Sequence, residues 1–324
     1  MSIAAIGWDS QIGLAEETTY GTPVTTSTHW LPIVSHSVQC NQKIDPVPFL
    51  SSGNAAFNNV RDDALLGHDV GGEIETIPAY ESTAFALLLM YAMGDVSTGA
   101  GPPYIHTFTP SIAATNIEGL SIQSIDGSQA DLDMAMIYDG CIVNTMELEW
   151  EAQGFGRARF GIIGRRGYGY TAIDGSPSYP TAEEMLGHHV GPLVWDQSHV
   201  LTRFGIRLNR NLGRRPKLGS IYTDRPQPTG LAEIMAFGTL EIDEDNQSMY
   251  ADYLANTQAD ASVTIAGTGN NRLVVNMHNA RIMTLSKPIN RAGVLTFDFE
   301  MRCKADATDH GLSLALRNAN ASPY

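Results

Sequence analysis

One stretch, Asp139–Gly164, constrains the fold of this chain more than any other. Its sequence, DGCIVNTMELEWEAQGFGRARFGIIG, alternates apolar and polar side chains. In its first part Met146 and Leu148 share one face, whereas Glu147 and Glu149 share the other. A period of two residues is typical of a β-strand with one buried face. The same pattern resumes in the second part, so we expect a long β-hairpin.

The two faces of this hairpin match only in one register. A three-residue loop, Ala152–Gly154 with Gly154 in the left-handed conformation, keeps both faces aligned. The resulting cross-strand pairs are Glu149 with Arg157, Glu147 with Arg159, and Met146 with Phe160. A slip of one residue would bury the charged side chains, so the pattern specifies this register strongly.

A second hairpin with the same pattern occurs at His278–Cys303, near the end of the chain. It aligns with the first without a gap and keeps the apolar positions, with Leu285 on Met146, Phe297 on Ala158 and Phe299 on Phe160. A second pair of segments, 72–89 and 238–255, also aligns, and each is a short strand followed directly by a helix. Because both pairs occur in the same order, we predict an internal duplication.

The predicted fold class is therefore mainly β with short flanking helices, arranged as two tandem β-sandwich or partial-barrel modules. The predicted division is a first module at 1–166 with an N-terminal arm and a long loop at 41–66, a linker at 167–200, and a second module at 201–324 with a long loop at 209–230. A chain of 324 residues is long enough for two domains of ordinary size.

Composition excludes several classes of protein. The formal net charge of −15 argues against a non-specific nucleic-acid binder, which should be basic. Three cysteines without a CxxC pair argue against a disulfide framework and indicate a reducing compartment during synthesis. The N-terminus does not resemble a signal peptide, and the longest apolar run is about half of the ~20 residues that a membrane helix needs. We expect a soluble protein, made in a cytoplasm, without membrane contact.

No catalytic or cofactor motif stands out. The chain lacks GxSxG, HExxH, GxGxxG and Walker sequences, so we predict no enzyme activity and no cofactor. His188, His189, Asp196 and His199 fit no strong metal motif, and we interpret them as solvated. The basic stretches Gly164–Gly169 and 214–217 either meet acidic surfaces of neighbouring subunits or lie in solvent.

Four phrases carry a resemblance to a known family. They are GLAEETTYGTPV, YIHTFTPS, IYDGCIVNTMELEWEAQGFGRARFGIIGRR and FDFEMRCKADATDHGLSLALRN, and together they span most of the chain. In combination they resemble the major tail tube proteins of long-tailed bacteriophages. The predicted linker and the two long loops resemble that family least.

The resemblance implies a structural virion protein that assembles into stacked rings, forming a tube through which genomic DNA passes during ejection. Its expected partners are further copies of itself, the tape measure protein, the tail terminator and distal tail proteins, with transient and non-specific passage of double-stranded DNA. A duplicated module favours three chains per ring with pseudo-sixfold symmetry, and six chains per ring is the alternative. A tail terminator, a decoration protein or a ligand-binding β-sandwich remain the rival functions.

Site residues follow from the same reasoning. We expect the charged face, Glu147, Glu149, Arg157 and Arg159, to look into the lumen or at a neighbouring subunit. We expect the wall hairpins to pack on the core through Met146, Leu148, Phe160, Leu285, Phe297 and Phe299. We expect contacts between rings from Asn54, Phe57, Arg61, Arg214, Arg215 and Lys217. Catalytic and metal-binding residues are not predicted.

Overall fold

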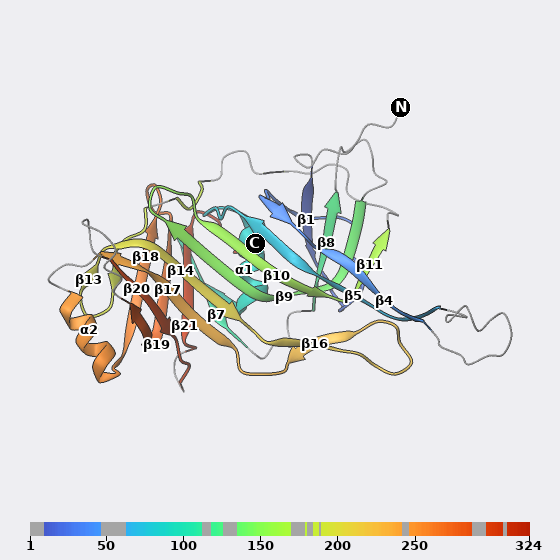
Figure 1. The fold of residues 1–324 in the computed structure, drawn as a ribbon. Coiled ribbons are helices and arrows are strands. Elements are labelled where there is room, and N and C mark those ends of the chain that lie inside the picture. Colours follow the sequence, from blue (N-terminus) through green and yellow to red (C-terminus); the bar gives the residue numbers. More distant parts are fainter. Residues whose placement is uncertain are drawn as a thin grey trace, which may run out of the picture.

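The protein is mainly β, with two short helices (Figure 1). The structure, a computed structural model, describes residues 10–46, 63–111, 118–125, 135–169, 179, 184–187, 189–241, 246–286, 296–306 and 310–324. Within these residues no helix is both long and apolar enough to cross a membrane. The prediction of a mainly β fold with short helices is confirmed.

A long antiparallel sheet runs through both halves of the chain. Its strands, in spatial order, are β3 (Ser35–His36) and β4 (Gln39–Pro46) side by side on one edge, then β5 (Asp63–Thr76), β10 (Arg157–Gly164), β9 (Ala135–Glu151), β14 (Leu201–Asn209), β17 (Glu233–Glu241), β20 (Thr296–Arg302) and β19 (Arg272–Ser286). The halves meet where β9 pairs with β14, so the long sheet continues from one half into the other.

Each half adds a second sheet, because the long strands β9 and β19 take part in two sheets. In the first half the order is β2 (His29–Leu31), β1 (Gln11–Glu16), β8 (Leu120–Ile125), β9 and β11 (Arg166–Gly169). In the second it is β13 (Ser198–His199), β12 (Leu193–Val194), β18 (Gln258–Ala266), β19 and β21 (Leu312–Asn318), followed by two strands that the first half contributes, β7 (Tyr104–Pro110) and β6 (Gly94–Thr98).

The first hairpin has the register that the sequence predicts. In β9 and β10, Glu149 lies opposite Arg157, Glu147 opposite Arg159, and Met146 opposite Phe160. The predicted turn is wrong in two respects. The strands end at Glu151 and begin again at Arg157, so the connection is longer than three residues, and Gln153 rather than Gly154 has a positive φ, of 65°.

The second hairpin, β19 and β20, reproduces this arrangement. Leu285 lies opposite Phe299, as the alignment with Met146 and Phe160 requires. Both hairpins also skip one residue of the longer strand, Asn144 in β9 and Met283 in β19, two positions before those pairs. The two halves therefore share a strand order and an irregularity in pairing. Their common origin by duplication stays a prediction.

Helix α1 (Thr83–Met93) lies against the core of the first half. Ser82 caps its N-terminus by accepting a hydrogen bond from the amide of Phe85, and Gly94 ends it in the left-handed conformation. From the sequence alone, Pro78 predicts the first turn of a helix that begins at Ala79, and the structure shows that this start is wrong. All residues from Ala84 to Met93 are buried, so the helix is apolar all round rather than along one stripe.

Helix α2 (Asn246–Ala255) occupies the corresponding place in the second half, after β17, and it is more exposed. Met249 is buried, whereas Tyr250 and Leu254 are exposed. Strands β12 and β13 form inside the predicted linker and pair with each other, and β12 also pairs with β18. The boundaries proposed for the two modules stay a prediction.

The predicted long loops are partly strands. β4 extends to Pro46 and β5 begins at Asp63, so both ends of the predicted loop at 41–66 are paired. The predicted loop at 209–230 contains a two-stranded arm, β15 (Leu212–Arg215) and β16 (Asp224–Pro228). Figure 1 shows the arm leaving the second half and reaching across toward β4 and β5 of the first.

Candidate assembly surface

The side of the long sheet that faces away from the core is lined with charged residues, and this side is called the charged face. Its charges alternate in sign from strand to strand: Glu73 and Glu75 on β5, Arg157 and Arg159 on β10, Glu147, Glu149 and Glu151 on β9, and Arg203 and Arg207 on β14. Opposite charges on neighbouring strands stabilise the pairing that places them together.

Each arginine of the charged face has carboxylates beside it. The guanidinium group of Arg159 lies 3.8 Å from Glu73, 3.6 Å from Glu75 and 3.7 Å from Glu147. Arg157 lies 3.6 Å from Glu75. These groups are partly exposed, so each pair contributes little to stability, about 0–1 kcal/mol. The larger effect of these pairs is that a neighbouring carboxylate offsets the charge of each of these arginines.

The joint between the halves carries the closest ion pairs. Arg207 contacts Glu147 at 2.8 Å, and Arg203 donates from Nε to Glu149 at 2.7 Å and contacts the same carboxylate through a second nitrogen. Hydrogen bonding to Glu149 raises the pKa of Arg203. Both guanidinium groups also lie 5.4 Å from the ring of Phe237 on β17, within reach of a cation–π contact.

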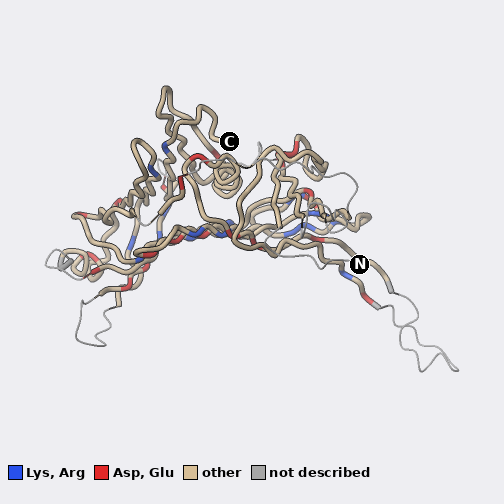
Figure 2. Tube along the Cα trace, turned by 90° about the horizontal axis from the view of Figure 1, so that it is seen from above, with Lys and Arg blue, Asp and Glu red and all other residues tan. Residues whose placement is uncertain are grey.

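The predicted core residues lie on the opposite side of the same strands. Their side chains are buried at Met146, Leu148, Phe160, Phe297 and Phe299, and partly buried at Leu285. Figure 2 shows the strands of the long sheet along the lower border of the view, where red and blue segments gather, with the rest of the protein above them. The two ends of this border lie lower than its middle, so the charged face is concave.

The long sheet is open at both ends. β4 pairs with β5 on one side, and no strand among the described residues pairs with its other side. At the far end, β19 pairs with β18 only as far as Arg281, so residues 282–286 have β20 on one side and no described strand on the other. Unpaired strand edges are a liability that proteins cover, shorten or pair with another chain.

The residues predicted to contact the next ring fall into two groups. Asn54, Phe57 and Arg61 lie outside the described residues. Arg214, Arg215 and Lys217 belong to the arm, where Arg214 donates to the carbonyl of Val70 at 2.9 Å and lies 3.4 Å from Asp69. Lys217 lies 3.5 Å from Asp224 within the arm. The tip of the arm presents Leu218, whose side chain is fully exposed.

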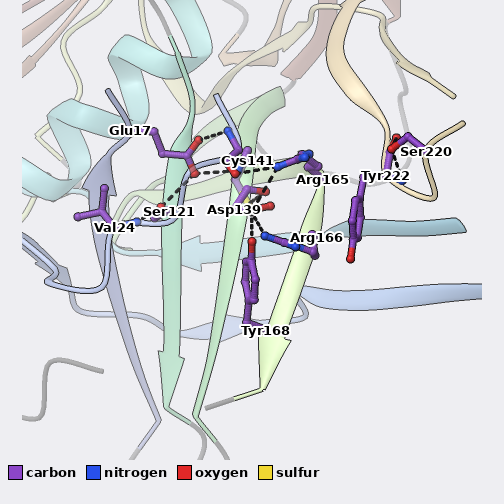
Figure 3. Close-up of polar contacts among 12 residues, drawn as sticks. Glu17, Val24, Ser121, Asp139, Cys141, Arg165, Arg166, Tyr168, Ser220 and Tyr222 are labelled. Carbon is purple, nitrogen blue, oxygen red and sulfur yellow. Dashed lines mark hydrogen bonds and ion pairs between the residues drawn. The ribbon is translucent and has the colours of Figure 1, made fainter. Parts of the chain in front are cut away.

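A buried polar cluster holds the N-terminal segment and the arm against the first half (Figure 3). Glu17, only 4% exposed, accepts hydrogen bonds from the amides of Gly21 and Gly140 at 2.7 and 2.8 Å and from the hydroxyl of Ser121 at 3.0 Å. Burial raises the pKa of Glu17, and these hydrogen bonds oppose the shift. Gly140 has a φ of 59°, and a Cβ there would lie 2.9 Å from Tyr20 and Arg165.

Asp139 is the second carboxylate of this cluster and is fully buried. It accepts a hydrogen bond from the hydroxyl of Tyr168 at 2.8 Å and lies 3.4 Å from Arg166. The guanidinium group of Arg166 lies 3.7 Å from the ring centre of Tyr168 and 4.7 Å from that of Tyr222, which belongs to the arm. Arg165 lies 3.7 Å from Asp139.

This cluster was not predicted from the sequence. The basic stretch Gly164–Gly169 was expected to meet neighbouring subunits or solvent, whereas Arg165 and Arg166 pair with Asp139 inside the chain. The neighbouring thiol of Cys141 is fully buried, and burial raises its pKa. Among the described residues no group of three potential metal ligands occurs.

We expect Asp139 to give the protein a pH-dependent stability. Burial raises its pKa from 3.8 to about 6, against the opposing effect of Arg166 and Arg165. The folded state therefore binds this proton more tightly than the unfolded state does. The resulting stabilisation is complete below the unfolded pKa and is lost as the pH rises through about 6. At 1.36 kcal/mol per pKa unit it amounts to about 3 kcal/mol.

The variant Asp139→Asn should lose this pH dependence. Denaturant unfolding at pH 7.5 and pH 4 measures this dependence. The free energy of unfolding of the wild type minus that of the variant should be larger at pH 4 than at pH 7.5, by up to about 3 kcal/mol. Asp95→Asn, at an exposed position, is the control and should follow the wild type at both pH values. A constant difference between the wild type and Asp139→Asn would contradict the expectation.

The fold and this surface define a class of protein: a mainly β subunit whose long sheet is open at both ends and whose concave side is charged. The chain belongs to the phage tail tube protein family, whose model matches residues 7–308. No curated protein matches the chain. It is thus a structural component of a phage tail, and so of the virion, in a family that is not one of enzymes.

Proposed function

We propose that the protein assembles with copies of itself into rings that stack into the tail tube, and that the tube conducts genomic DNA during ejection. The observation that carries this proposal is the open long sheet, with β4 at one end and β19 at the other. Two different edges on one subunit make a head-to-tail contact, and such contacts close into a ring when the rotation between subunits allows it.

The charged face is the proposed wall of the lumen. It is concave, and it lies on the side of the sheet away from the core (Figure 2). Its arginines are neutralised by neighbouring glutamates, and the chain as a whole is acidic, with a formal charge of −15. DNA binding depends on unpaired basic groups that replace the counterions of the phosphates. A wall of this kind favours passage of DNA over binding.

Three chains per ring is the proposed stoichiometry. The matching strand orders of the two halves would let each chain supply two similar wall segments, giving pseudo-sixfold symmetry. Contacts between rings are assigned to the tip of the arm, with its exposed Leu218, and to the loops predicted for that purpose. The tape measure protein, the tail terminator and distal tail proteins are the proposed partners in the tail. We assign the protein no enzyme activity and place its synthesis in the host cytoplasm.

Electron microscopy of the purified protein tests the proposal. We expect hollow tubes of stacked rings, because the upper face of one ring fits the lower face of the next, and each added ring presents that same upper face to a further ring. Rotational averaging of end-on views then measures the symmetry, and the mass of isolated rings gives the number of chains. Single rings that never stack would favour a tail terminator, and a protein that stays monomeric at high concentration would contradict ring assembly.

A further inference from the structure

The contact between the two halves of this chain is a template for a contact between copies. Strand β9 pairs with β14 so that Thr145 lies opposite Asn209, Met146 opposite Leu208, and Glu147 opposite Arg207. The amide of Arg210 donates to the carbonyl of Asn144 at 2.9 Å, which fixes which residues of each strand exchange backbone hydrogen bonds. A joint of the same kind between copies needs one strand equivalent to β9 and one equivalent to β14, at opposite free ends of the long sheet.

The counterpart of β9 is β19. Each pairs with the second strand of its hairpin, and each skips one residue, Asn144 or Met283, at the corresponding position. Residues 284–286 of β19 therefore correspond to residues 145–147 of β9. Residues 145–147 of β9 pair with β14. The corresponding edge of β19, at residues 284–286, pairs with no described strand.

The counterpart of β14 is the edge formed by β3 and β4. In the second half, β17 lies between β14 and β20. In the first half, β5 lies in the same way between the β3–β4 edge and β10. The registers show which residues correspond. In the second half Phe204 lies opposite Gly238 of β17, which in turn lies opposite Phe299 of β20. In the first half His36 lies opposite Ile74 of β5, which lies opposite Phe160 of β10, the counterpart of Phe299, so His36 corresponds to Phe204. Residues 39–41 therefore correspond to residues 207–209.

The backbone of β4 is oriented for this role. Ser37 donates its amide to the carbonyl of Glu73 on β5, and amides alternate in direction along a strand, so those of Cys40 and Gln42 point away from β5. The side chains of Cys40 and Leu285 lie on the core side and are only partly buried. At the joint within the chain, the corresponding residues Leu208 and Met146 are each only 1% exposed.

We propose that residues 284–286 of β19 in one copy pair antiparallel with residues 39–41 of β4 in the next. Leu285 then lies opposite Cys40, Ser286 opposite Gln39, and Thr284 opposite Asn41. This inference rests on the proposed ring assembly and adds to it the two strands and their register. Joining the edges in this way continues the long sheet from copy to copy and buries both partly covered side chains.

The two joints differ in charge. Where Arg207 meets Glu147 within the chain, Gln39 would meet Ser286 between copies. The joint between copies thus depends on backbone hydrogen bonds and on burial of Cys40 and Leu285, and it lacks that ion pair. We therefore expect ring formation to depend less on salt concentration than it would if ion pairs held the joint together.

Cysteine cross-linking tests the register. Gln39→Cys and Ser286→Cys, placed together in a Cys40→Ser background, would face each other in a pair without backbone hydrogen bonds, with Cα atoms ~4.5 Å apart and so within disulfide range. In assembled protein under oxidation we expect reductant-sensitive multimers on a denaturing gel. The matched control is Gln42→Cys with Ser286→Cys, displaced by three positions and on the opposite face, and it should not cross-link.

The outcomes separate this inference from the function on which it rests. If electron microscopy shows tubes but the Gln39–Ser286 pair does not cross-link, or the displaced pair cross-links equally well, the proposed register is wrong and ring assembly stands. If the wild type forms neither rings nor tubes, ring assembly is wrong and the joint is wrong with it. Cross-linked species that end at a closed set of chains support both.

Discussion

Replacing Trp150 by Ala should lower the free energy of unfolding by about 3–5 kcal/mol. Trp150 lies near the end of β9, is 1% exposed, and is among the largest fully buried side chains of the described residues. Its ring stacks on that of Phe204 in β14, with centroids 6.3 Å apart and planes 17° apart. The substitution would leave a cavity where the two halves meet, since backbone pairing holds both strands in place.

Denaturant unfolding followed by circular dichroism measures this effect. Trp150→Phe keeps an aromatic ring against Phe204 and should retain most of the stability. Phe155→Ala, in the adjacent connection and 65% exposed, should stay within about 0.5 kcal/mol of the wild type. An unchanged midpoint for Trp150→Ala would contradict a packed joint between β9 and β14.

The hairpins are the part of the fold that the sequence predicts best. Alternation fixes which side chains share a face, and glutamates opposite arginines exclude a slip in register, so Glu147 and Arg159 are paired as expected. The connection between the strands is predicted less well. The expectation of a left-handed glycine at 154 rests on residue type, whereas Gln153 adopts that conformation in the longer turn.

The order of strands from different parts of the chain could not be predicted. Alternation in 201–209 shows that one face is buried, but it does not show that β14 lies beside β9 rather than beside another strand. Most of the edge strand β4 was missed for a related reason. Residues 41–45 contain a single apolar residue, Ile44, so the segment has no apolar period and was interpreted as loop.

The buried polar cluster could not be predicted from local pattern either. Glu17, Asp139 and Arg166 are polar residues that ordinarily lie in solvent, and only the tertiary fold brings them together. One signal was present in the sequence. The phrases that carry the family resemblance contain Glu17 and Tyr20 in one case and Asp139 and Arg166 in another, and the structure places these phrases in contact (Figure 3).

Replacing Gln42 by Pro should abolish tube formation and leave the monomer folded. The amide of Gln42 points away from β5, so its loss leaves the pairing of β4 with β5 intact, and proline is tolerated at such positions of edge strands. In the proposed joint this amide would donate to the next copy, as Arg210 donates to Asn144 within the chain. The proline ring would also collide with the incoming strand.

Sedimentation and electron microscopy measure this effect. A loss of ~1.4 kcal/mol at each joint raises the protein concentration needed for assembly about tenfold, and a ring contains several joints. Gln42→Ala is the matched control, because it removes the same side chain and keeps the amide, and it should form tubes as the wild type does. Circular dichroism shows whether the proline variant is folded. Normal tubes from folded Gln42→Pro would mean that the outer edge of β4 takes no part in closing the ring.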